Sequence, residues 1–482
     1  MKQFDHESLC HDPLHGYIAF TSAHGLPAAE AAEEHLIDHP WVQRMRQIHQ
    51  LQTAWWVFPT AEHTRFQHII GVMHLGSRAA AALYDSLADV CPDTPSRGYV
   101  ESLLRVAGLL HDVGHGPFGH FFDEHYLADY GLTHETLGSA IIKSQLGDII
   151  RRLRRNPNSQ LASHETLDPE HVAYLITRPT VTDGSNSATS VADNSGASGA
   201  NVAPTWLRFL RSLFSGLYTI DNMDFVLRDA YMSGYNTRAF DLERLLHYSF
   251  FSPSGLTLHA RGIAALANFV GVRAQLFRAV YFHRTVRAID LALAELFADS
   301  KAYVFPGNPL ERLDLYQQFT EWSLLVDVAR WPTSEDPVKR ELGLRWQRLL
   351  ARKLPWRMAC ERTRFFAAGE AERGSIFSSQ RFVEQALRER LPRELRDIPL
   401  RVDLARHVHR PGTRGPAAGQ NFLYDSASGV TRPLMDNELL RQIPLSSRIC
   451  RIYTQTSGHD RQLATALDSL LGTESEDDRT NM

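Results

Sequence analysis

The chain of 482 residues has few cysteines, little net charge and no long apolar run. Its four cysteines lie far apart and form no C-x-x-C pair, which argues against a disulfide framework and against a cysteine-ligated zinc site. The formal net charge is -4, so no overall basic field attracts nucleic acid, and any such contact would have to be local. The N-terminus is too polar for a signal peptide, and no uninterrupted apolar run is long enough to span a bilayer. We therefore expect a cytoplasmic protein without a membrane span.

Three common motifs are also missing. The chain contains no G-x-x-x-x-G-K phosphate loop, no G-x-S-x-G nucleophile motif and no H-E-x-x-H zinc motif. Their absence removes the commonest competing classes of nucleotide-binding protein and hydrolase.

Most of the chain shows helical spacing of its apolar residues. The spacing is helical from Ala28 to about Val90, with an interruption at Pro59, which cannot continue a helix. Residues 99–112 are apolar on most faces, as in a buried helix. Strand-like runs are short, namely YIAF near the N-terminus and PLRVDLA, NFLYD and SRICRIYT near the C-terminus. These patterns predict a mainly α fold with a helical core and a small α+β region in the C-terminal part.

Changes in composition suggest where the chain divides. We expect the core domain at residues 1–308, interrupted at 180–204 by a flexible insertion rich in Ser, Gly, Asn and Ala. A helical extension should follow at 309–374 and a small α+β region at 375–470. The polar residues 471–482 should form a disordered tail.

Two stretches place a His-Asp pair before another histidine, LLHDVGHGPFGHFFDEH at residues 109–125 and HDPLHGY at residues 11–17. In the longer stretch, the pair His111–Asp112 closes the buried helix, where both side chains are costly to bury unless something satisfies them. A divalent metal would do so, and two further ligands would complete its site. His68 and Asp221 are polar residues within otherwise apolar helical surroundings, and they are the candidates.

The pattern H…HD…D is the metal signature of the HD phosphohydrolase superfamily, which this chain resembles. The blocks QRMRQIHQL, VFPTAEHTRFQHIIGVMHL, DNMDFVLRDAYMSG and VYFHRT occur in the order found in its deoxynucleoside triphosphate triphosphohydrolase branch, which includes bacterial HD enzymes and the animal SAM-and-HD-domain protein. The match covers roughly residues 11–300. It implies an HD-domain helical core and a site for Mn, Fe, Zn, Ni or Mg. The implied metal ligands are His68, His111, Asp112 and Asp221. In HDPLHGY the resemblance implies a structural role, or a place near a regulatory site, rather than a metal site.

The resemblance also implies the acid that would protonate a leaving group. A bound metal makes hydroxide available near neutral pH, and a histidine is readily tuned to supply the proton. His120 is the implied acid, supported by Asp123 and His134, while His115 would face phosphate. His120 and Asp123 are three residues apart, so they can share one face of a helix.

Further positions are implied for the substrate. Arg65 could grip phosphate oxygens with its guanidinium. The sugar and base would be held by Gln50, Leu51, Asp229 and Tyr281, and close packing on the sugar would leave no room for a 2′-hydroxyl. Three residues depart from the pattern common among relatives. Asn222 stands where Lys or Arg is frequent, Phe225 where Tyr is frequent, and Gln67 where Glu is frequent.

Regulation and assembly are implied by a further set of positions. Asp38, Gln43 and Arg46 match positions that bind an activating guanine nucleotide between subunits in the animal enzyme, although Ser8 stands where Lys would be expected. A homo-oligomer, either a dimer or a tetramer, is therefore expected. The run RRLRR at residues 151–155 is interpreted as a solvated helix end rather than a nucleic-acid site.

The expected function is metal-dependent hydrolysis of deoxynucleoside triphosphates to deoxynucleoside and triphosphate. Two alternatives stay open. The protein could be an HD phosphohydrolase or phosphodiesterase that acts on other nucleotides or oligonucleotides, or a non-catalytic nucleotide-sensing or nucleic-acid-binding scaffold with a structural metal.

Overall fold

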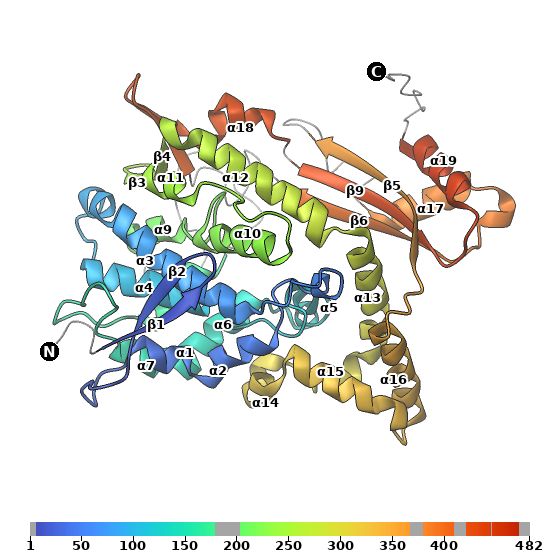
Figure 1. The fold of residues 1–482 in the computed structure, drawn as a ribbon, viewed down its shortest axis with the longest axis horizontal. Coiled ribbons are helices and arrows are strands. Elements are labelled where there is room, and N and C mark those ends of the chain that lie inside the picture. Colours follow the sequence, from blue (N-terminus) through green and yellow to red (C-terminus); the bar gives the residue numbers. More distant parts are fainter. Residues whose placement is uncertain (1–5, 179–202, 367–378, 409–420, 445, 472–482) are drawn as a thin grey trace, which may run out of the picture. The chain divides into compact units, whose positions relative to one another are not determined.

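The computed structural model describes residues 6–178, 203–366, 379–408, 421–444 and 446–471. Most of the expected insertion at 180–204, and residues 472–482 of the expected tail, lie outside the described residues. The described chain is mainly helical, which confirms the predicted fold class. It divides into two compact units, and each unit draws on separate parts of the sequence (Figure 1). The first unit contains residues 1–272, 306–325 and 411–441, and the second contains 273–305, 326–410 and 442–482.

Two long helices form the centre of the first unit. The helices α3 (Arg65–Val90) and α4 (Arg97–Leu110) pack closely because glycines lie where they meet. A Cβ atom added at Gly76 would lie 2.8 Å from the carbonyl oxygen of Leu104, and one at Gly108 would lie 2.8 Å from that of Val72. Residues 98–110 of α4 are all buried, as the apolar pattern predicted.

The other helices of the first unit surround this pair, and α10 packs directly on α3. The helices α12 and α15 each begin in the first unit and end in the second. The bounds are α1 (Glu33–Ile37), α2 (Pro40–Gln43), α5 (His120–His125), α6 (His134–Ile141), α7 (Gly147–Arg152), α8 (Pro169–Ile176), α9 (Thr205–Arg211), α10 (Ile220–Met232), α11 (Leu242–His247), α12 (Ile263–Leu276), α14 (Leu313–Gln318), α15 (Glu321–Arg330) and α18 (Glu438–Gln442).

Two sheets belong to the first unit. The predicted run YIAF lies in β2 (Gly16–Thr21), which pairs with β1 (Glu7–Asp12) in an antiparallel hairpin. A four-stranded sheet has the order β3-β4-β7-β8, in which β4 and β7 run parallel. The predicted strand NFLYD is β7, and it pairs with β4 and β8 rather than with the other two predicted C-terminal strands. The bounds are β3 (Ser249–Ser252), β4 (Gly255–His259), β7 (Asn421–Asp425) and β8 (Val430–Pro433).

The second unit is built on a three-stranded antiparallel sheet in the order β5-β9-β6. Its strands are β5 (Arg357–Phe366), β6 (Leu400–Val408) and β9 (Ser446–Thr454), and the predicted runs PLRVDLA and SRICRIYT form β6 and β9. Apolar side chains of the sheet pack with α17 (Gln380–Arg390) and α19 (Asp460–Leu471) in one buried core. The remaining helices of this unit are α13 (Arg284–Val304) and α16 (Pro337–Leu350).

The structure divides the chain differently from the linear boundaries at 308 and 374. The α13 helix belongs to the second unit, whereas β7 and β8 return to the first. The expectation of an all-helical extension at 309–374 is wrong at its end, because β5 lies there. That strand forms by pairing with β9, about 90 residues further along the chain, and such a distant partner leaves no local signal.

One described helical stretch, residues 260–281, is long and apolar enough to cross a membrane by length and composition. Half of its most apolar window is buried, and the core helices of soluble proteins pass the same test. This stretch alone therefore does not indicate a membrane span.

Candidate active site

The four predicted metal ligands converge from three helices. His68 lies in the first turn of α3, His111 and Asp112 follow the last turn of α4, and Asp221 lies in the first turn of α10. The Nε2 atom of His68 is 3.2 Å from Nε2 of His111 and 3.1 Å from Oδ1 of Asp221. The Nε2 atom of His111 is 3.4 Å from Oδ1 of Asp112 and 3.7 Å from Oδ1 of Asp221. The donor atoms of His68, His111 and Asp112 all lie within 4.8 Å of one another, a spacing compatible with one divalent cation, and Asp221 lies beside both imidazoles.

The rest of each imidazole is held so that Nε2 faces the ligand cluster. The Nδ1–H group of His68 donates to Oδ2 of Asp224 (2.8 Å), and that of His111 donates to the carbonyl oxygen of Gly108 (2.8 Å). These bonds fix the tautomer in which Nε2 carries the lone pair that a metal needs.

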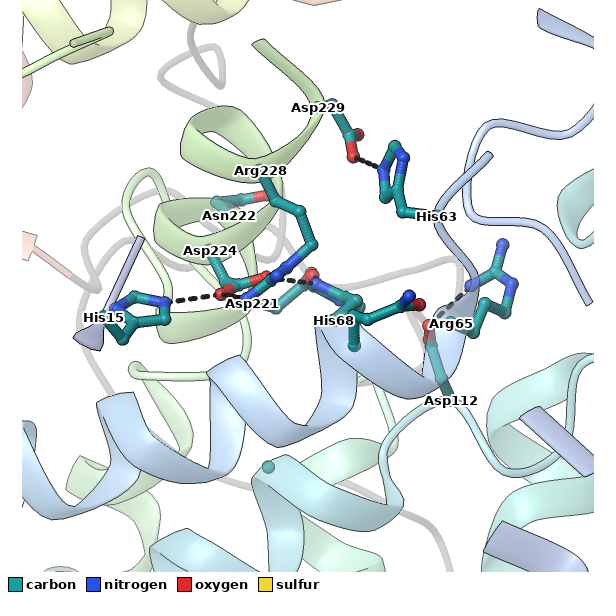
Figure 2. A network of polar contacts seen from close by, with 12 residues as sticks. His15, His63, Arg65, His68, Asp112, Asp221, Asn222, Asp224, Arg228 and Asp229 are labelled. Atoms are coloured by element: carbon teal, nitrogen blue, oxygen red, sulfur yellow. Dashed lines mark hydrogen bonds and ion pairs between the residues drawn. The ribbon is translucent and has the colours of Figure 1, made fainter. Parts of the chain in front are cut away.

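Asp224 is the centre of a buried polar network behind the metal ligands (Figure 2). It accepts hydrogen bonds from Nε and Nη2 of Arg228 (2.8 and 2.9 Å), and it lies 2.7 Å from Nε2 of His15. Arg228 in turn donates to Asp12 (2.8 Å). Asp12 and His15 of the HDPLHGY stretch therefore support His68 through Arg228 and Asp224. They lie behind His68 rather than among the predicted metal ligands.

The carboxylates of this site shift the pKa values of the imidazoles beside them, and the imidazoles shift those of the carboxylates. Burial lowers the pKa of His68, but its hydrogen bonds with Asp221 and Asp224 outweigh burial and raise the pKa to about 10. Burial raises the pKa of Asp221, yet its hydrogen bonds with His111 and His68 hold that pKa below its usual range. The carboxylates therefore stay ionised, and a divalent metal can replace the protons on the imidazoles.

Arg65 approaches the site from the first residue of α3. Its Nη1 donates to Oδ2 of Asp112 (2.5 Å), while its guanidinium lies against Gly119. Gly119 has a φ of +55°, and a Cβ atom there would lie 2.2 Å from Nη2 of Arg65, so only glycine fits this position. The structure thus places Arg65 between a metal ligand and the glycine loop at residues 114–119.

The predicted acid cluster forms a second group, which surrounds the carboxylate of Asp123. The Nδ1 atom of His134 lies 2.6 Å from Oδ2 of Asp123, and Nδ1 of His120 lies 3.2 Å from the same oxygen. The Nδ1 atom of His115 is 3.4 Å from Oδ1 of Asp123, and its ring stacks on that of His134 at a centroid distance of 3.7 Å. Its Nε2 atom is 3.5 Å from Oδ1 of Asp112, so His115 connects the two groups.

The members of this cluster differ in exposure. The side chain of His120 is 67% exposed, whereas His115 is fully buried. Burial raises the pKa of Asp123, but the imidazoles of His115, His120 and His134 lower it far more, so the carboxylate is ionised. Burial and the nearby His115 lower the pKa of His134. His120 is thus the cluster imidazole that a ligand can reach, and its orientation is set by an ionised carboxylate.

The residues expected to hold sugar and base fall in different places. Gln50 has a buried Oε1 atom without a hydrogen-bond partner among the described residues, and the adjacent Leu51 is buried. Asp229 accepts a hydrogen bond from Nε2 of His63 (2.7 Å), a residue the sequence analysis did not select (Figure 2). Tyr281 belongs to the second unit, where its ring lies 4.6 Å from that of Phe277.

Comparison with known proteins agrees with this arrangement. A sequence model of the HD domain matches residues 65–173, which hold His68, His111 and Asp112. The matched segment, residues 65–173, is therefore an HD domain. The chain is similar to the uncharacterized protein YwfO of Bacillus subtilis, with 27% identity over 356 residues that make up 70% of each chain.

Two further comparisons cover longer stretches of the chain than the HD-domain match does. The human deoxynucleoside triphosphate triphosphohydrolase SAMHD1 is 27% identical over 310 residues, which are 62% of this chain and 46% of that protein. The chain thus spans about half the length of the SAMHD1 proteins it matches. A crystal structure of a hypothetical protein from Aquifex aeolicus shares the fold, with a TM-score of 0.62 and 23% identity over 96% of this chain and all of that one.

The positions that were expected to bind a regulatory nucleotide are adjacent. The Nε2 group of Gln43 donates to the carbonyl oxygen of Ile37 (2.8 Å), and Nε of Arg46 donates to Oε1 of Gln43 (2.8 Å). Arg46 also lies over the ring of Phe66, 3.5 Å from its centroid. Asp38 is exposed at the end of α1 and follows Ile37 in the chain. These three side chains therefore share one region of the surface.

Of the three residues that depart from the pattern of the relatives, only Gln67 has a local structural explanation. Gln67 accepts a hydrogen bond from the backbone N–H of Thr64 (2.7 Å), which is the capping role that Glu would fill at the start of α3. Asn222 lies beside Asp221 on α10 (Figure 2), and Phe225 is half-buried one turn further along.

In the RRLRR run at residues 151–155, Arg151 is exposed and pairs with Asp148.

Several residues of the site were missed by the sequence analysis. Asp224 and Arg228 are spaced i, i+4 on α10, and this spacing was the available signal for an ion pair. Gly71 supports the same network, because a Cβ atom there would lie 2.0 Å from Oδ1 of Asp224. His63 gave no local signal, since its partner Asp229 lies more than 150 residues away in the sequence.

Proposed function

We propose that this protein is a metal-dependent phosphohydrolase that converts deoxynucleoside triphosphates to deoxynucleosides and inorganic triphosphate. The observation that carries the proposal is the adjacency of two sites. Four ligand side chains converge on one position, and His115 connects them to a cluster that presents an exposed histidine. The similarity to SAMHD1, a deoxynucleoside triphosphate triphosphohydrolase, supports the choice of substrate.

His68, His111, Asp112 and Asp221 would hold the metal. A divalent ion bound there supplies a water of lowered pKa and neutralises phosphate charge. Asp224 and the carbonyl of Gly108 keep both imidazoles turned toward the site. The donor set of two nitrogens and two carboxylates is compatible with Mn, Fe, Zn, Ni or Mg, and the identity of the ion is a matter for measurement.

His120 would give its proton to the leaving 5′ oxygen of the deoxynucleoside. It is the exposed member of its cluster, and Asp123 holds Nδ1 so that Nε2 is available to a ligand. Asp123 also stabilises the protonated imidazole by its charge. His115 and Arg65, both buried beside Asp112, would meet the phosphate groups.

In the balanced reaction, water adds its oxygen to the α-phosphorus while the bond between that phosphorus and the 5′ oxygen breaks. The 5′ oxygen takes a proton and leaves as the hydroxyl of the deoxynucleoside. Buried acceptors near Leu51, including Oε1 of Gln50, would bind the sugar, and Leu51 would pack where a 2′-hydroxyl needs room. Deoxyribose preference follows from that packing.

Chromatography of the products tests the proposal. Purified protein with Mn²⁺ or Fe²⁺ and each deoxynucleoside triphosphate should yield deoxynucleoside and triphosphate in equal amounts. Release of monophosphate and pyrophosphate would contradict the assigned bond. Absence of turnover, with metal and nucleotide still bound, would instead favour a non-catalytic nucleotide sensor.

A second candidate, hydrolysis of other nucleotides or oligonucleotides, is favoured by Asn222. Many relatives are expected to have a cation there, and an amide beside Asp221 supplies no charge for a third phosphate. A panel of ribonucleotides, monophosphates and short oligonucleotides separates the two candidates by relative kcat/KM.

Assembly and activation also belong to this proposal. The similarity to SAMHD1 and the grouping of Asp38, Gln43 and Arg46 on one surface support a homo-oligomer that is activated by a nucleotide. Light scattering with and without a guanine nucleotide should show a larger assembly when the nucleotide is present. An unchanged mass together with unchanged activity would contradict activation.

A further inference from the structure

A short segment beyond the HD-domain match contacts two parts of the candidate site at once. We call residues 316–321 the clamp segment. On one side it contacts residues 44–49, which lead into Gln50 and Leu51, and on the other it contacts the glycine loop at 114–119. The sequence analysis assigned it no role.

Glu321 makes the most specific of these contacts. Its side chain is fully buried, and Oε1 accepts a hydrogen bond from the Nδ1–H group of His49 (2.8 Å). Its Oε2 accepts from two backbone N–H groups, those of His49 and Phe118, each at 3.4 Å. One carboxylate therefore joins the residue before Gln50 to the glycine loop that carries His115 and leads into His120.

The backbone at the loop end of this contact is strained. Phe118 has a φ of +60°, a conformation that non-glycine residues rarely adopt. Such a residue persists only where its surroundings hold it, and these positions cluster at functional sites. The bond from Phe118 N–H to Glu321 is one such restraint, placed two residues before His120.

Other side chains of the same region hold the start of the loop. The hydroxyl of Tyr316 donates to the carbonyl oxygen of Gly114 (2.9 Å). Arg44 donates through Nη1 to the carbonyl oxygen of His115 (2.7 Å) and through Nη2 to that of Phe319 (2.6 Å). Both ends of the loop are therefore tied to the clamp segment.

We propose that Glu321 is a positioning residue that holds the sugar-binding residues Gln50 and Leu51 in register with the loop bearing His115 and His120, and so sets the discrimination between deoxyribose and ribose. This inference rests on the proposed function and adds a determinant of its specificity. Glu321 acts through His49 and Phe118 and does not itself meet the substrate.

Glu321→Gln is the sharpest probe because it keeps the volume of the side chain. An amide has one accepting oxygen and one donating nitrogen, whereas all three partners of Glu321 donate. At the Oε2 position the amide nitrogen faces two backbone N–H donors, and at the Oε1 position it finds an acceptor only when His49 moves its proton from Nδ1 to Nε2. Either a contact is lost or the tautomer of His49 changes. The predicted result is a roughly tenfold fall in the ratio of kcat/KM for a deoxynucleoside triphosphate to that for its ribonucleotide, at unchanged metal content.

This ratio distinguishes positioning from general loss of structure. A variant that merely unfolds in part has less active protein, which lowers both kcat/KM values equally and leaves their ratio unchanged. His49→Leu removes the donor at the other end of the same bond and should lower the ratio by a similar factor. Because the two changes break one connection, the double variant should be no worse than the stronger single variant.

Glu62→Gln is the matched control. The Glu62 carboxylate lies 3.4 Å from Nε2 of the same His49, but its side chain is 58% exposed and solvent screens it. It should keep the wild-type ratio within twofold. A ratio within twofold of wild type in Glu321→Gln, with wild-type protein active, overturns this inference alone. If wild-type protein hydrolyses no deoxynucleoside triphosphate, the proposed function fails and the inference fails with it.

Discussion

The first unit contains two clusters of histidine and aspartate that differ in how their nitrogens are used. In the metal cluster, His68 and His111 direct Nδ1 to outside acceptors, so both Nε2 atoms face the same position. In the acid cluster, the imidazoles of His115, His120 and His134 all direct Nδ1 toward the carboxylate of Asp123. The donor atoms of each cluster lie within 4.8 Å of one another, a spacing that allows a metal at either one. The hydrogen bonds distinguish them, because both Nε2 atoms of the first cluster face one position, whereas Oδ2 of Asp123 in the second cluster is bonded to His120 and His134.

The largest expected effect comes from removing a ligand of the metal cluster. Asp112→Ala should abolish bound metal and reduce hydrolysis to background, because Asp112 supplies one of four converging donors. Elemental analysis and a triphosphate assay on the same sample measure both. Asp148→Ala, at a side chain that is 99% exposed, is the control and should match wild type. Full metal content in Asp112→Ala would remove this residue from the ligand set.

The next effect tests the acid cluster. His120→Asn should lower kcat by about 10²- to 10⁴-fold, since it removes the proton donor for the leaving oxygen. Metal content should stay at the wild-type level, because His120 is directed toward Asp123 and not toward the metal ligands. Loss of metal in this variant would show that the two clusters share one ion.

A smaller effect is expected from the network behind the metal cluster. Asp224→Asn should weaken metal binding by about 10- to 100-fold, because the amide orients the imidazole of His68 less well than the carboxylate does. Excess metal should restore most of the activity, which a titration of activity against metal concentration measures. An unchanged titration curve would assign Asp224 a purely structural role through Arg228.

The smallest effect tests a residue outside both clusters. Gln67→Glu keeps the capping bond to Thr64 and adds a negative charge in the first turn of α3, which should stabilise the fold by about 0.3–1 kcal/mol. Thermal unfolding measures the change, and kcat should stay within about twofold of wild type. A large change in metal affinity would instead place residue 67 in the metal site.

The sequence predicted the residues of both clusters because they occur in short, recognisable blocks. The stretch at 109–125 holds His111, Asp112, His115, His120 and Asp123, so a single loop and helix supply most of the chemistry. His68 and Asp221 were candidates as polar residues in apolar helical surroundings, and the resemblance to a known family implied that they are ligands. The structure brings their side chains to within 3.1 Å.

The residues that support these clusters could not be predicted in the same way. Asp12 and Glu321 act on partners more than 200 residues away. The block HDPLHGY implied a structural role for Asp12 but did not name its partner, and nothing in the local sequence marks Glu321 as a buried anion. The strand β5 was missed for the same reason, since its partner β9 lies far along the chain. Local patterns predict elements and motifs, whereas long-range polar contacts require the fold.

Hydrolysis in water labelled with ¹⁸O tests the central claim most directly. The account predicts that the metal-loaded protein converts a deoxynucleoside triphosphate to triphosphate that contains one ¹⁸O atom, while the deoxynucleoside carries none. Label in the deoxynucleoside, or pyrophosphate as the product, would contradict attack at the α-phosphorus.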